Sequence, residues 1–388
     1  MIKVAVATTS RADYSIYFST LRRLQAEPMA ELCLIVTGTH LSAAHGMTVN
    51  AIRDDGFSVS YEFSCVTEDE DSPLSTATSM SQALEGFAHA FSALRPDVVL
   101  VLGDRFEMHG AAAAAVPFRI PVAHIHGGDV TEGAYDDQFR HSVTKLSHLH
   151  FPVTKLSAKR IVQMGEDPAR VVVCGSPALD DIASIGHMTL AKLGADIGFP
   201  LEVPPLLVTY HPTTLSQGDQ GEEARMFFDS LDCIEGPVVV TQGNVDTGHK
   251  GVTATAKGFV AKSANRVLVS NLGREHYVSL MRHAWAMAGN SSSGILEAPS
   301  LCLPVLNVGL RQGGRERANN VIDVPLDRAA IQAGLRQAQD PDFKAGLRAE
   351  DSPYVASRPA CETIVEKLVN TEFNPDLLAK KWHTLASA

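Results

Sequence analysis

Short runs of apolar, β-branched residues alternate with longer stretches of helical pattern along the whole chain. The predicted strands of the first half are Val4–Thr8, Leu32–Thr37, Val98–Gly103, Val122–His126 and Val171–Gly175. Those of the second half are Leu206–Tyr210, Val238–Thr241, Val267–Ser270, Ala286–Gly289 and Val305–Val308. Helical patterns between them include Tyr17–Ala26, Ser79–Leu94 and Arg140–Met164. Apolar strands that alternate with helices predict an α/β fold whose parallel sheets are covered on both faces.

The pattern breaks near residues 176–205, where the proline-rich segment Gly198-Phe-Pro-Leu-Glu-Val-Pro-Pro205 precedes a new strand. A length of 388 residues favours two or more domains. We therefore predict two doubly wound, Rossmann-like domains, over residues 1–180 and 181–370, with the ligand cleft between them. Residues 371–388 are predicted to form a helical tail, for which packing against the N-terminal domain is one arrangement.

Charge and cysteine content limit the class of partner. The formal net charge of −11 argues against nucleic acid and anionic membrane surfaces, which both attract basic patches. No apolar run reaches membrane-spanning length, and the apolar N-terminus is too short for a signal peptide. The 6 cysteines include no Cys-x-x-Cys pair and are expected to be buried thiols. We expect a cytoplasmic protein with a small-molecule partner and no nucleic-acid or membrane partner.

Acidic and basic side chains follow the predicted strands of the first half, where doubly wound sheets bind their ligands. Asp104 and Arg105 come directly after one strand, placed respectively to move a proton and to hold a phosphate. The alternative for this pair is a capped helix start with a surface arginine. The next strand leads into a segment with six acid–base side chains in sixteen residues: His126, Asp129, Glu132, Asp136, Asp137 and His141. Proton transfer at carbon needs such groups, so this segment favours a functional interpretation.

Anion-binding features follow strands in both halves. In Gly289-Asn-Ser-Ser-Ser-Gly-Ile-Leu-Glu297, three serines precede a helix start and form a neutral phosphate cradle, while Glu297 can accept hydrogen bonds from a ribose diol. Arg311 and Arg315, in a glycine-rich turn, supply cations. The loop after the first strand, Thr8–Tyr14, adds Arg11, although taken alone this loop favours plain helix capping by Ser10 or Asp13.

No metal or cofactor is predicted. His124 and His126 lie two residues apart at a strand end, but no third ligand stands at a convincing spacing, and a histidine bonded to backbone explains His124. The chain has no Walker loop and no Gly-x-Gly-x-x-Gly after its first strand, which argues against ATP hydrolysis and NAD binding.

In this order the segments resemble the UDP-N-acetylglucosamine 2-epimerase family, nearest to its hydrolysing branch, over about residues 1–370. The matching segments are Arg11-Ala-Asp-Tyr14, Val36-Thr-Gly-Thr-His-Leu41, Gly103-Asp-Arg-Phe106, Asp136-Asp-Gln-Phe-Arg-His141, His211-Pro212 and Gly289-Asn-Ser-Ser292. The resemblance implies the two-domain architecture of nucleotide-sugar glycosyltransferases (GT-B), with acid–base residues in the first domain and the UDP moiety bound by the second. It implies loss of the C2 proton and of UDP, addition of water to the resulting 2-acetamidoglucal, and release of N-acetylmannosamine for sialic-acid synthesis.

The resemblance also implies roles for single residues. Asp104 and Asp136 match catalytic carboxylates, and Arg140 and His211 match positions that contact the substrate. The residues that match the UDP side are Arg11, Asn244, Lys250, Ser291, Ser292, Glu297 and Arg315. Many family members carry a glutamate where this chain has His126, so either the imidazole takes over the proton transfer or Asp129 or Glu132 does. The expected partners are the nucleotide sugar and further copies of the chain, in a homodimer or homotetramer.

The departure at His126 keeps a second substrate open, a UDP- or GDP-linked 2,4-diacetamido-6-deoxy sugar of the legionaminic-acid route. A non-hydrolysing 2-epimerase, which returns UDP to the sugar, is a further alternative. A glycosyltransferase of the same architecture would need an acceptor groove, and a sugar-nucleotide sensor would not need the acid–base segment between His126 and His141.

Overall fold

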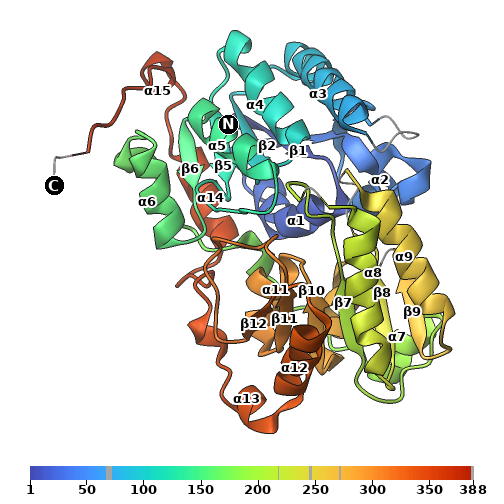
Figure 1. Ribbon diagram of the computed structural model, residues 1–388. Coiled ribbons are helices and arrows are strands. Elements are labelled where there is room, and N and C mark those ends of the chain that lie inside the picture. The colour runs from blue at the N-terminus through green and yellow to red at the C-terminus, as the bar shows by residue number, and fades with distance from the viewer. Residues whose placement is uncertain (67–71, 217, 244–246, 271, 386–388) are drawn as a thin grey trace. The chain divides into compact units, whose positions relative to one another are not determined.

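The computed structural model describes residues 1–66, 72–216, 218–243, 247–270 and 272–385 (Figure 1). The chain divides into two compact units. Unit 1 comprises Met1–Asp129, Asp136–Asp180 and Ala356–Ala388, and unit 2 comprises Val130–Tyr135 and Asp181–Val355. The C-terminal residues therefore belong to the same unit as the N-terminus.

Unit 1 is built on a six-stranded parallel sheet in the order β3-β2-β1-β4-β5-β6. Its strands are β1 (Ile2–Thr8), β2 (Ala30–Val36), β3 (Val59–Glu62), β4 (Val98–Leu102), β5 (Val122–Ile125) and β6 (Leu149–Phe151). Its helices are α1 (Arg11–Gln25), α2 (Val49–Asp54), α3 (Pro73–Leu94), α4 (Phe106–Phe118), α5 (Asp136–Leu146), α6 (Lys155–Gln163), α14 (Ala360–Val369) and α15 (Pro375–Leu378). Every residue of the central strand β4 is buried, which accounts for its continuous apolar sequence.

Unit 2 repeats this plan with a six-stranded parallel sheet in the order β12-β11-β10-β7-β8-β9. Its strands are β7 (Leu206–Thr209), β8 (Val238–Thr241), β9 (Arg266–Val269), β10 (Ala286–Gly289), β11 (Val305–Val308) and β12 (Val321–Val324). Its helices are α7 (Leu190–Ile197), α8 (Gln220–Ser230), α9 (His249–Ala261), α10 (Gly273–His283), α11 (Ser293–Leu296), α12 (Arg328–Gln339) and α13 (Pro341–Ala345). Two buried clusters, around Leu206 and around Leu207, form its core.

The predicted α/β fold with two doubly wound sheets is confirmed. In each sheet the strand order reverses once, between β1 and β4 in unit 1 and between β7 and β10 in unit 2. Ligands of such sheets bind outside the carboxyl ends of the strands at this reversal. The loops after these four strands are therefore the first place to look for a site.

Some predicted elements are wrong. The helical stretch Arg140–Met164 is instead α5, β6 and α6, because Pro152 cannot continue a helix and Thr154 caps α6, accepting a hydrogen bond from Ser157 N at 3.0 Å. The predicted strand Val171–Gly175 makes only one bridge, between Val171 and His150. The edge strands β3 and β12 were not predicted, since each includes at least one exposed polar residue and neither is a continuously buried apolar run.

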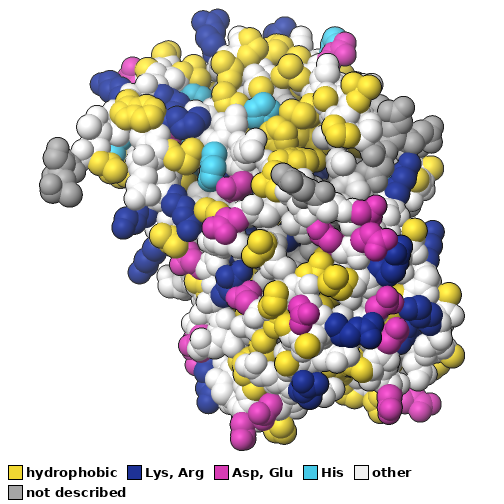
Figure 2. Space-filling view, in the orientation of Figure 1, with side chains coloured by type: hydrophobic (Ala, Val, Ile, Leu, Met, Phe, Trp, Pro, Cys, Tyr) yellow, Lys and Arg dark blue, Asp and Glu magenta, His cyan; other side chains and the backbone are white. Residues whose placement is uncertain are grey.

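The surface and the thiols add three observations. Among the described residues, no helix is long and apolar enough to cross a membrane. On the face shown in Figure 2, acidic and basic side chains are interspersed. All six cysteines are free thiols, but only Cys33, Cys65 and Cys174 are buried, and Cys233 is exposed, so the expectation of buried thiols is wrong for Cys233.

Candidate active site

The loop after β1 is fixed by a buried carboxylate. Ser10 caps α1 in a reciprocal capping box with Asp13, so the capping interpretation of this loop is confirmed. Asp13 accepts hydrogen bonds from Thr9 N at 2.9 Å and from Thr8 Oγ1 at 2.7 Å, and His40 lies beside it. Burial alone would raise the pKa of Asp13, but the hydrogen bonds, led by His40, lower it below its usual value. The ionised carboxylate therefore holds the loop that presents Arg11.

Arg140 on α5 gathers the carboxylates of the neighbouring segments. Its side chain is fully buried, with 1% exposure, and its guanidinium donates to Asp104, to Asp137 and, at 3.1 Å, to the backbone oxygen of Asp129. A buried guanidinium is tolerated only where its N–H groups find such acceptors. The structure therefore joins Asp104, which follows β4, to the first turns of α5, where Asp136 also lies.

His126 stands at the end of β5 in a strained conformation. Its φ of 63° lies in the left-handed region, which non-glycine residues seldom adopt outside sites that require it. The side chain is almost fully buried, and Nδ1 donates to Asp129 Oδ2 at 2.9 Å. Asp129 Oδ1 accepts a hydrogen bond from Ser157 Oγ at 2.7 Å, and Ser176 Oγ lies 3.4 Å from His126 Nε2. With Nδ1 protonated for Asp129, Nε2 carries the lone pair that a proton acceptor needs.

The side chains of His124 and Arg105 form hydrogen bonds within the protein. His124 Nε2 donates to Gly103 O at 2.8 Å, and burial lowers the pKa of His124 to about 3, so the neutral ring serves as a backbone support. The expected backbone-bonded role of His124 is thus confirmed. Arg105 forms a two-point ion pair with the buried carboxylate of Glu107, at 3.1 and 3.0 Å.

In unit 2 the side chain of Asn290, which follows β10, bonds to the backbone of the loop after β7, at the point where the strand order reverses. Asn290 Oδ1 accepts from His211 N at 2.7 Å, and Asn290 Nδ2 donates to His211 O at 2.8 Å. Gly289 is required beside this pair, because its φ is 136° and a Cβ there would lie 1.9 Å from Thr209 O. The paired amide fixes the backbone of His211 next to Ser291–Ser293, which we call the serine loop. Sequence reasoning assigned no role to Asn290, although its place between Gly289 and Ser291 after a strand was a signal.

The glycine-rich turn after β11 brings cations to the same region of unit 2. Arg311 Nη1 and Gln312 Nε2 both donate to Asn290 O, at 3.2 and 2.9 Å. In Arg315 both Nε and Nη1 are buried and have no hydrogen-bond partner within the described part of the chain. Buried N–H groups of a guanidinium are costly when unpaired, so Arg315 is the group of this turn best prepared for an anion.

The acid–base segment is divided between the two units. Residues Val130–Tyr135 belong to unit 2, where Glu132 N donates to Gly313 O at 3.1 Å and Leu215 N donates to Gly133 O at 3.3 Å. Asp129 and Asp136, on either side, belong to unit 1. Glu132 is thereby attached to the arginine-bearing turn and belongs to a different unit from the His126–Asp129 pair.

The remaining predicted residues surround these features in unit 2. Ser291, Ser292 and Glu297 flank the one-turn helix α11 and are all partly exposed. Lys250 is exposed in the first turn of α9. Asn244 lies outside the described residues.

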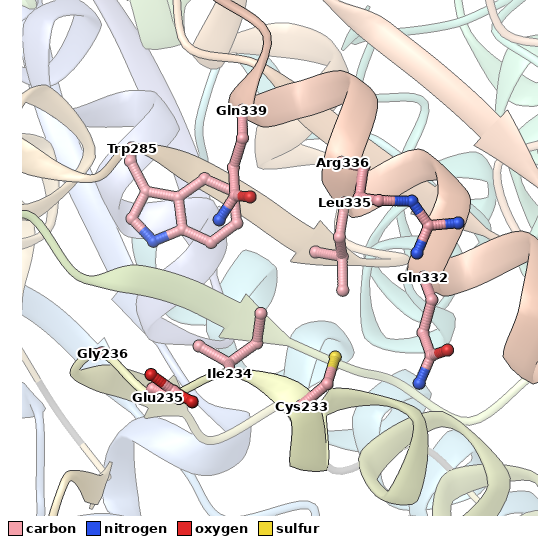
Figure 3. Close-up of a pocket in the computed structure, with 9 residues that line it drawn as sticks. All are labelled: Cys233, Ile234, Glu235, Gly236, Trp285, Gln332, Leu335, Arg336 and Gln339. Atoms are coloured by element: carbon pink, nitrogen blue, oxygen red, sulfur yellow. The ribbon is translucent and has the colours of Figure 1, made fainter.

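A surface pocket of about 460 Å³ in unit 2 lies elsewhere (Figure 3). Cys233, Gly236, Trp285 and Leu335 are among its lining residues, and Cys233 Sγ points into it (Figure 3). Gly236 precedes β8 and Trp285 precedes β10, so the pocket lies at the amino ends of the strands. It is therefore at the wrong end of the sheet for the ligand of a doubly wound fold. No group of three or more His, Cys, Asp or Glu side chains that could hold a metal ion occurs in the described ranges.

Comparison with known proteins gives concordant matches. A family model described as UDP-N-acetylglucosamine 2-epimerase matches residues 22–369. The UDP-N,N'-diacetylbacillosamine 2-epimerase (hydrolyzing) of Legionella pneumophila is 36% identical over 340 residues, which cover 87% of this chain and 88% of the relative. Polysialic acid biosynthesis protein P7 of Escherichia coli is 34% identical, covering 91% and 90%. A crystal structure of UDP-GlcNAc 2-epimerase from Neisseria meningitidis bound to UDP-GlcNAc has the same fold, with a TM-score of 0.80, 20% identity and coverage of 95% and 100%.

Proposed function

The chain belongs to the UDP-N-acetylglucosamine 2-epimerase family and is a hydrolysing nucleotide-sugar 2-epimerase, and we propose that it converts UDP-N-acetylglucosamine and water to N-acetylmannosamine and UDP. The relatives support the reaction class, and two of them support this substrate by name: UDP-N-acetylglucosamine 2-epimerase of Neisseria meningitidis, 30% identical, and that of Escherichia coli, 24% identical. In this proposal unit 1 carries the proton-transfer groups, and unit 2 binds the nucleotide.

The proposed reaction has two balanced steps. In the first, a base removes the C2 proton while the bond between C1 and the UDP oxygen breaks, so that UDP leaves with the bonding pair and a C1–C2 double bond forms. In the second, water supplies a hydroxyl to C1 and a proton returns to C2 from the opposite face. The 2-acetamidoglucal thus becomes N-acetylmannosamine. Both steps need proton-transfer groups at C2, and the first also needs cations at the departing diphosphate.

The arrangement around Arg140 is the observation that carries the proposal. It joins the carboxylates of Asp104 and Asp137 and the backbone oxygen of Asp129, so three segments converge on one guanidinium at the carboxyl ends of β4 and β5. Asp104 and Asp136 are the proposed carboxylates that exchange protons with the sugar. The His126–Asp129 pair supplies a second proton acceptor at Nε2.

On the nucleotide side, Arg315 carries the strongest physical argument. Its buried, unpaired N–H groups would donate to the diphosphate, which repays the cost of leaving them without water. We propose further contacts from the protein to UDP or to the sugar: Arg11, Arg105, His211, Asn244, Lys250, Ser291, Ser292, Glu297 and Arg311. Of these, Arg105 has its guanidinium already engaged by Glu107 and would reach phosphate only with its remaining N–H groups.

A second substrate is favoured by specific relatives. The Legionella pneumophila protein and a GDP/UDP-N,N'-diacetylbacillosamine 2-epimerase (hydrolyzing) of Campylobacter jejuni, 33% identical, are both named for N,N'-diacetylbacillosamine. The elimination at C1 and C2 is the same on that sugar, because its second acetamido group lies away from the bonds that break. The difference would therefore be one of recognition, not of mechanism.

The test is incubation with each nucleotide sugar in D₂O, followed by NMR of the sugar and measurement of released UDP. We expect free UDP, N-acetylmannosamine and deuterium at C2, with a higher kcat/KM for UDP-N-acetylglucosamine than for the UDP-diacetamido sugar. The reverse preference would replace the proposed substrate with the second one. UDP-N-acetylmannosamine as product, or product that keeps the original hydrogen at C2, would overturn the hydrolytic elimination.

The role of Arg315 is tested separately by UDP binding. Arg315→Met should weaken UDP affinity at least about tenfold, the value of one charge-assisted hydrogen bond. Arg336→Met, on the exposed side of α12, is the matched control and should leave the affinity unchanged. Equal affinities of the two variants would remove Arg315 from the nucleotide site.

A further inference from the structure

The backbone carbonyl groups at the C-terminal end of α5 accept hydrogen bonds from residues outside the helix. The last four carbonyl groups of any α-helix have no partner within it. Here Val143 O accepts from Ser147 Oγ at 2.7 Å, and Thr144 O accepts from Ser147 N at 3.2 Å. Lys145 O accepts from Lys380 Nζ at 2.7 Å, and the same ammonium donates to Ser147 O at 2.6 Å. A residue far along the chain therefore completes this helix end with a cation, the charge that a helix C-terminus favours.

Lys380 is fixed in place by a buried carboxylate. Its Nζ atom lies 2.7 Å from Glu166 Oε2, and the Glu166 side chain is only 2% exposed. Glu166 also accepts from Lys145 Nζ at 2.5 Å and from His150 Nε2 at 3.1 Å, so both its oxygens are engaged. Burial alone would raise the pKa of Glu166, but its hydrogen bonds from His150 and the two lysines lower it to about 2. The carboxylate is thus ionised whenever the enzyme works.

The residues after Lys380 hold the chain end against the same surface of unit 1. His383 N donates to Gly165 O at 2.9 Å, and Lys145 Nζ lies 4.4 Å from the centre of the Trp382 ring. The indole covers Gly165 so closely that a Cβ at Gly165 would lie 2.5 Å from its Cε2 atom. We name Lys380–His383 the C-terminal strap; it follows α15 at the red end of the chain in Figure 1.

We propose that Lys380 is a positioning residue: the C-terminal strap holds the end of α5 so that Arg140, two turns before it, stays aligned with Asp104. The effect on turnover rests on the proposed function. α5 has 11 residues and behaves as a short rigid rod, so a shift of its C-terminal end moves its first turns as well. Those turns carry Arg140, Asp137 and Asp136. Without the strap, Glu166 would keep Lys145 and His150, but Lys145 O would lose its partner and the last turn of α5 would loosen.

The experiment compares variants of the full-length chain. Lys380→Met removes the ammonium and keeps the apolar stem, Lys380→Arg restores a cation with donors, and Lys381→Met is the matched control at the exposed neighbouring position. Trp382→Ala loosens the strap at a side chain that is 70% exposed, where a folding defect is least expected. Two readouts are used: amide hydrogen exchange of α5, and kcat beside KM and UDP affinity at a temperature where each variant is folded.

For Lys380→Met we expect faster exchange in the last turn of α5, a kcat about tenfold lower, as a sub-ångström misplacement would cause, and KM and UDP affinity within about twofold of wild type. Lys380→Arg should recover most of kcat, and Trp382→Ala should change both readouts in the same direction by less. Lys381→Met should match wild type. Unchanged exchange in α5, or faster exchange with an unchanged kcat, would overturn the proposal, and a lower melting temperature as the sole effect would reduce Lys380 to a structural role.

The two readouts also separate this proposal from the proposed function. If the wild-type protein turned over neither nucleotide sugar, the proposed function would fail. The hydrogen-exchange measurement would still test whether the C-terminal strap holds α5. Unchanged exchange in Lys380→Met would overturn that role, and faster exchange confined to α5 would support it.

Discussion

His126 offers a test that separates backbone strain from chemistry. Its φ of 63° is favourable for glycine and unfavourable for alanine, while neither residue has an imidazole. His126→Gly and His126→Ala therefore remove the same functional group and differ only in the cost of the backbone. The comparison asks whether the left-handed turn exists to present the ring.

The expected magnitudes come from the contacts. Both variants lose the hydrogen bond to the Asp129 carboxylate, worth about 1.5–3 kcal/mol, although Asp129 keeps Ser157. Alanine also retains about 1.5 kcal/mol of left-handed strain, which glycine removes. Glycine in turn favours the unfolded chain by about 0.7 kcal/mol. His126→Gly should therefore unfold at a higher urea concentration than His126→Ala, by the equivalent of about 0.8 kcal/mol.

Activity should not show this order. If the His126 ring transfers a proton, both variants should lose about 10²–10⁴-fold in kcat, equally within error. The assay is UDP release from UDP-N-acetylglucosamine at about 25 °C, with urea unfolding of the same samples. A His126→Gly variant with nearly wild-type turnover would refute the reasoning, because the ring would then be a structural support and Asp129 the next candidate.

Three further predictions concern Asp104, the serine loop and the buried histidines. Asp104→Asn should nearly abolish turnover and leave UDP affinity within a few-fold, measured by UDP release and by calorimetric titration; near-normal turnover would show that Asp104 does not transfer the proton. Ser292→Ala and Glu297→Ala should raise KM and weaken UDP binding more than they lower kcat, since the proposed contacts to the nucleotide would be the same in ground and transition states. A defect in kcat alone, with unchanged UDP affinity, would show that these residues do not bind the nucleotide. Acid should destabilise the fold. Burial is the main reason that the pKa values of His124 and His148 are lowered, to about 3 and about 4 respectively. Below about pH 6.5 the unfolded chain therefore binds protons that the folded chain does not, and the free energy of unfolding falls. Urea unfolding at about pH 7.5 and about pH 5.0 should differ by up to about 2 kcal/mol for each of these histidines, and equal stability at the two values would contradict their buried, neutral state.

Local sequence was informative wherever a residue's role depends on its immediate neighbours. Fully buried strands are recognisable as continuous apolar runs, and chain order alone then places Asp104 after β4 and Ser291 after β10. The secondary-structure prediction was wrong where the local residue pattern fits a different element from the one that forms. The polar and apolar residues of Arg140–Met164 fit a helix by spacing alone, and only pairing with β5 makes Leu149–Phe151 a strand.

The sequence by itself therefore determined the α/β class, the doubly wound sheets and the strand ends that carry acidic, serine and arginine side chains, because apolar periodicity and chain order are local properties. Only the tertiary structure decided which of these groups pair. It placed Arg140 between Asp104 and Asp137, paired Arg105 with Glu107, and left Nε and Nη1 of Arg315 without a partner among the described residues. It also brought Lys380 to the end of α5, a contact between residues 235 positions apart. Such pairings depend on which segments lie side by side in the folded protein, and the spacing of residues along the chain does not specify this.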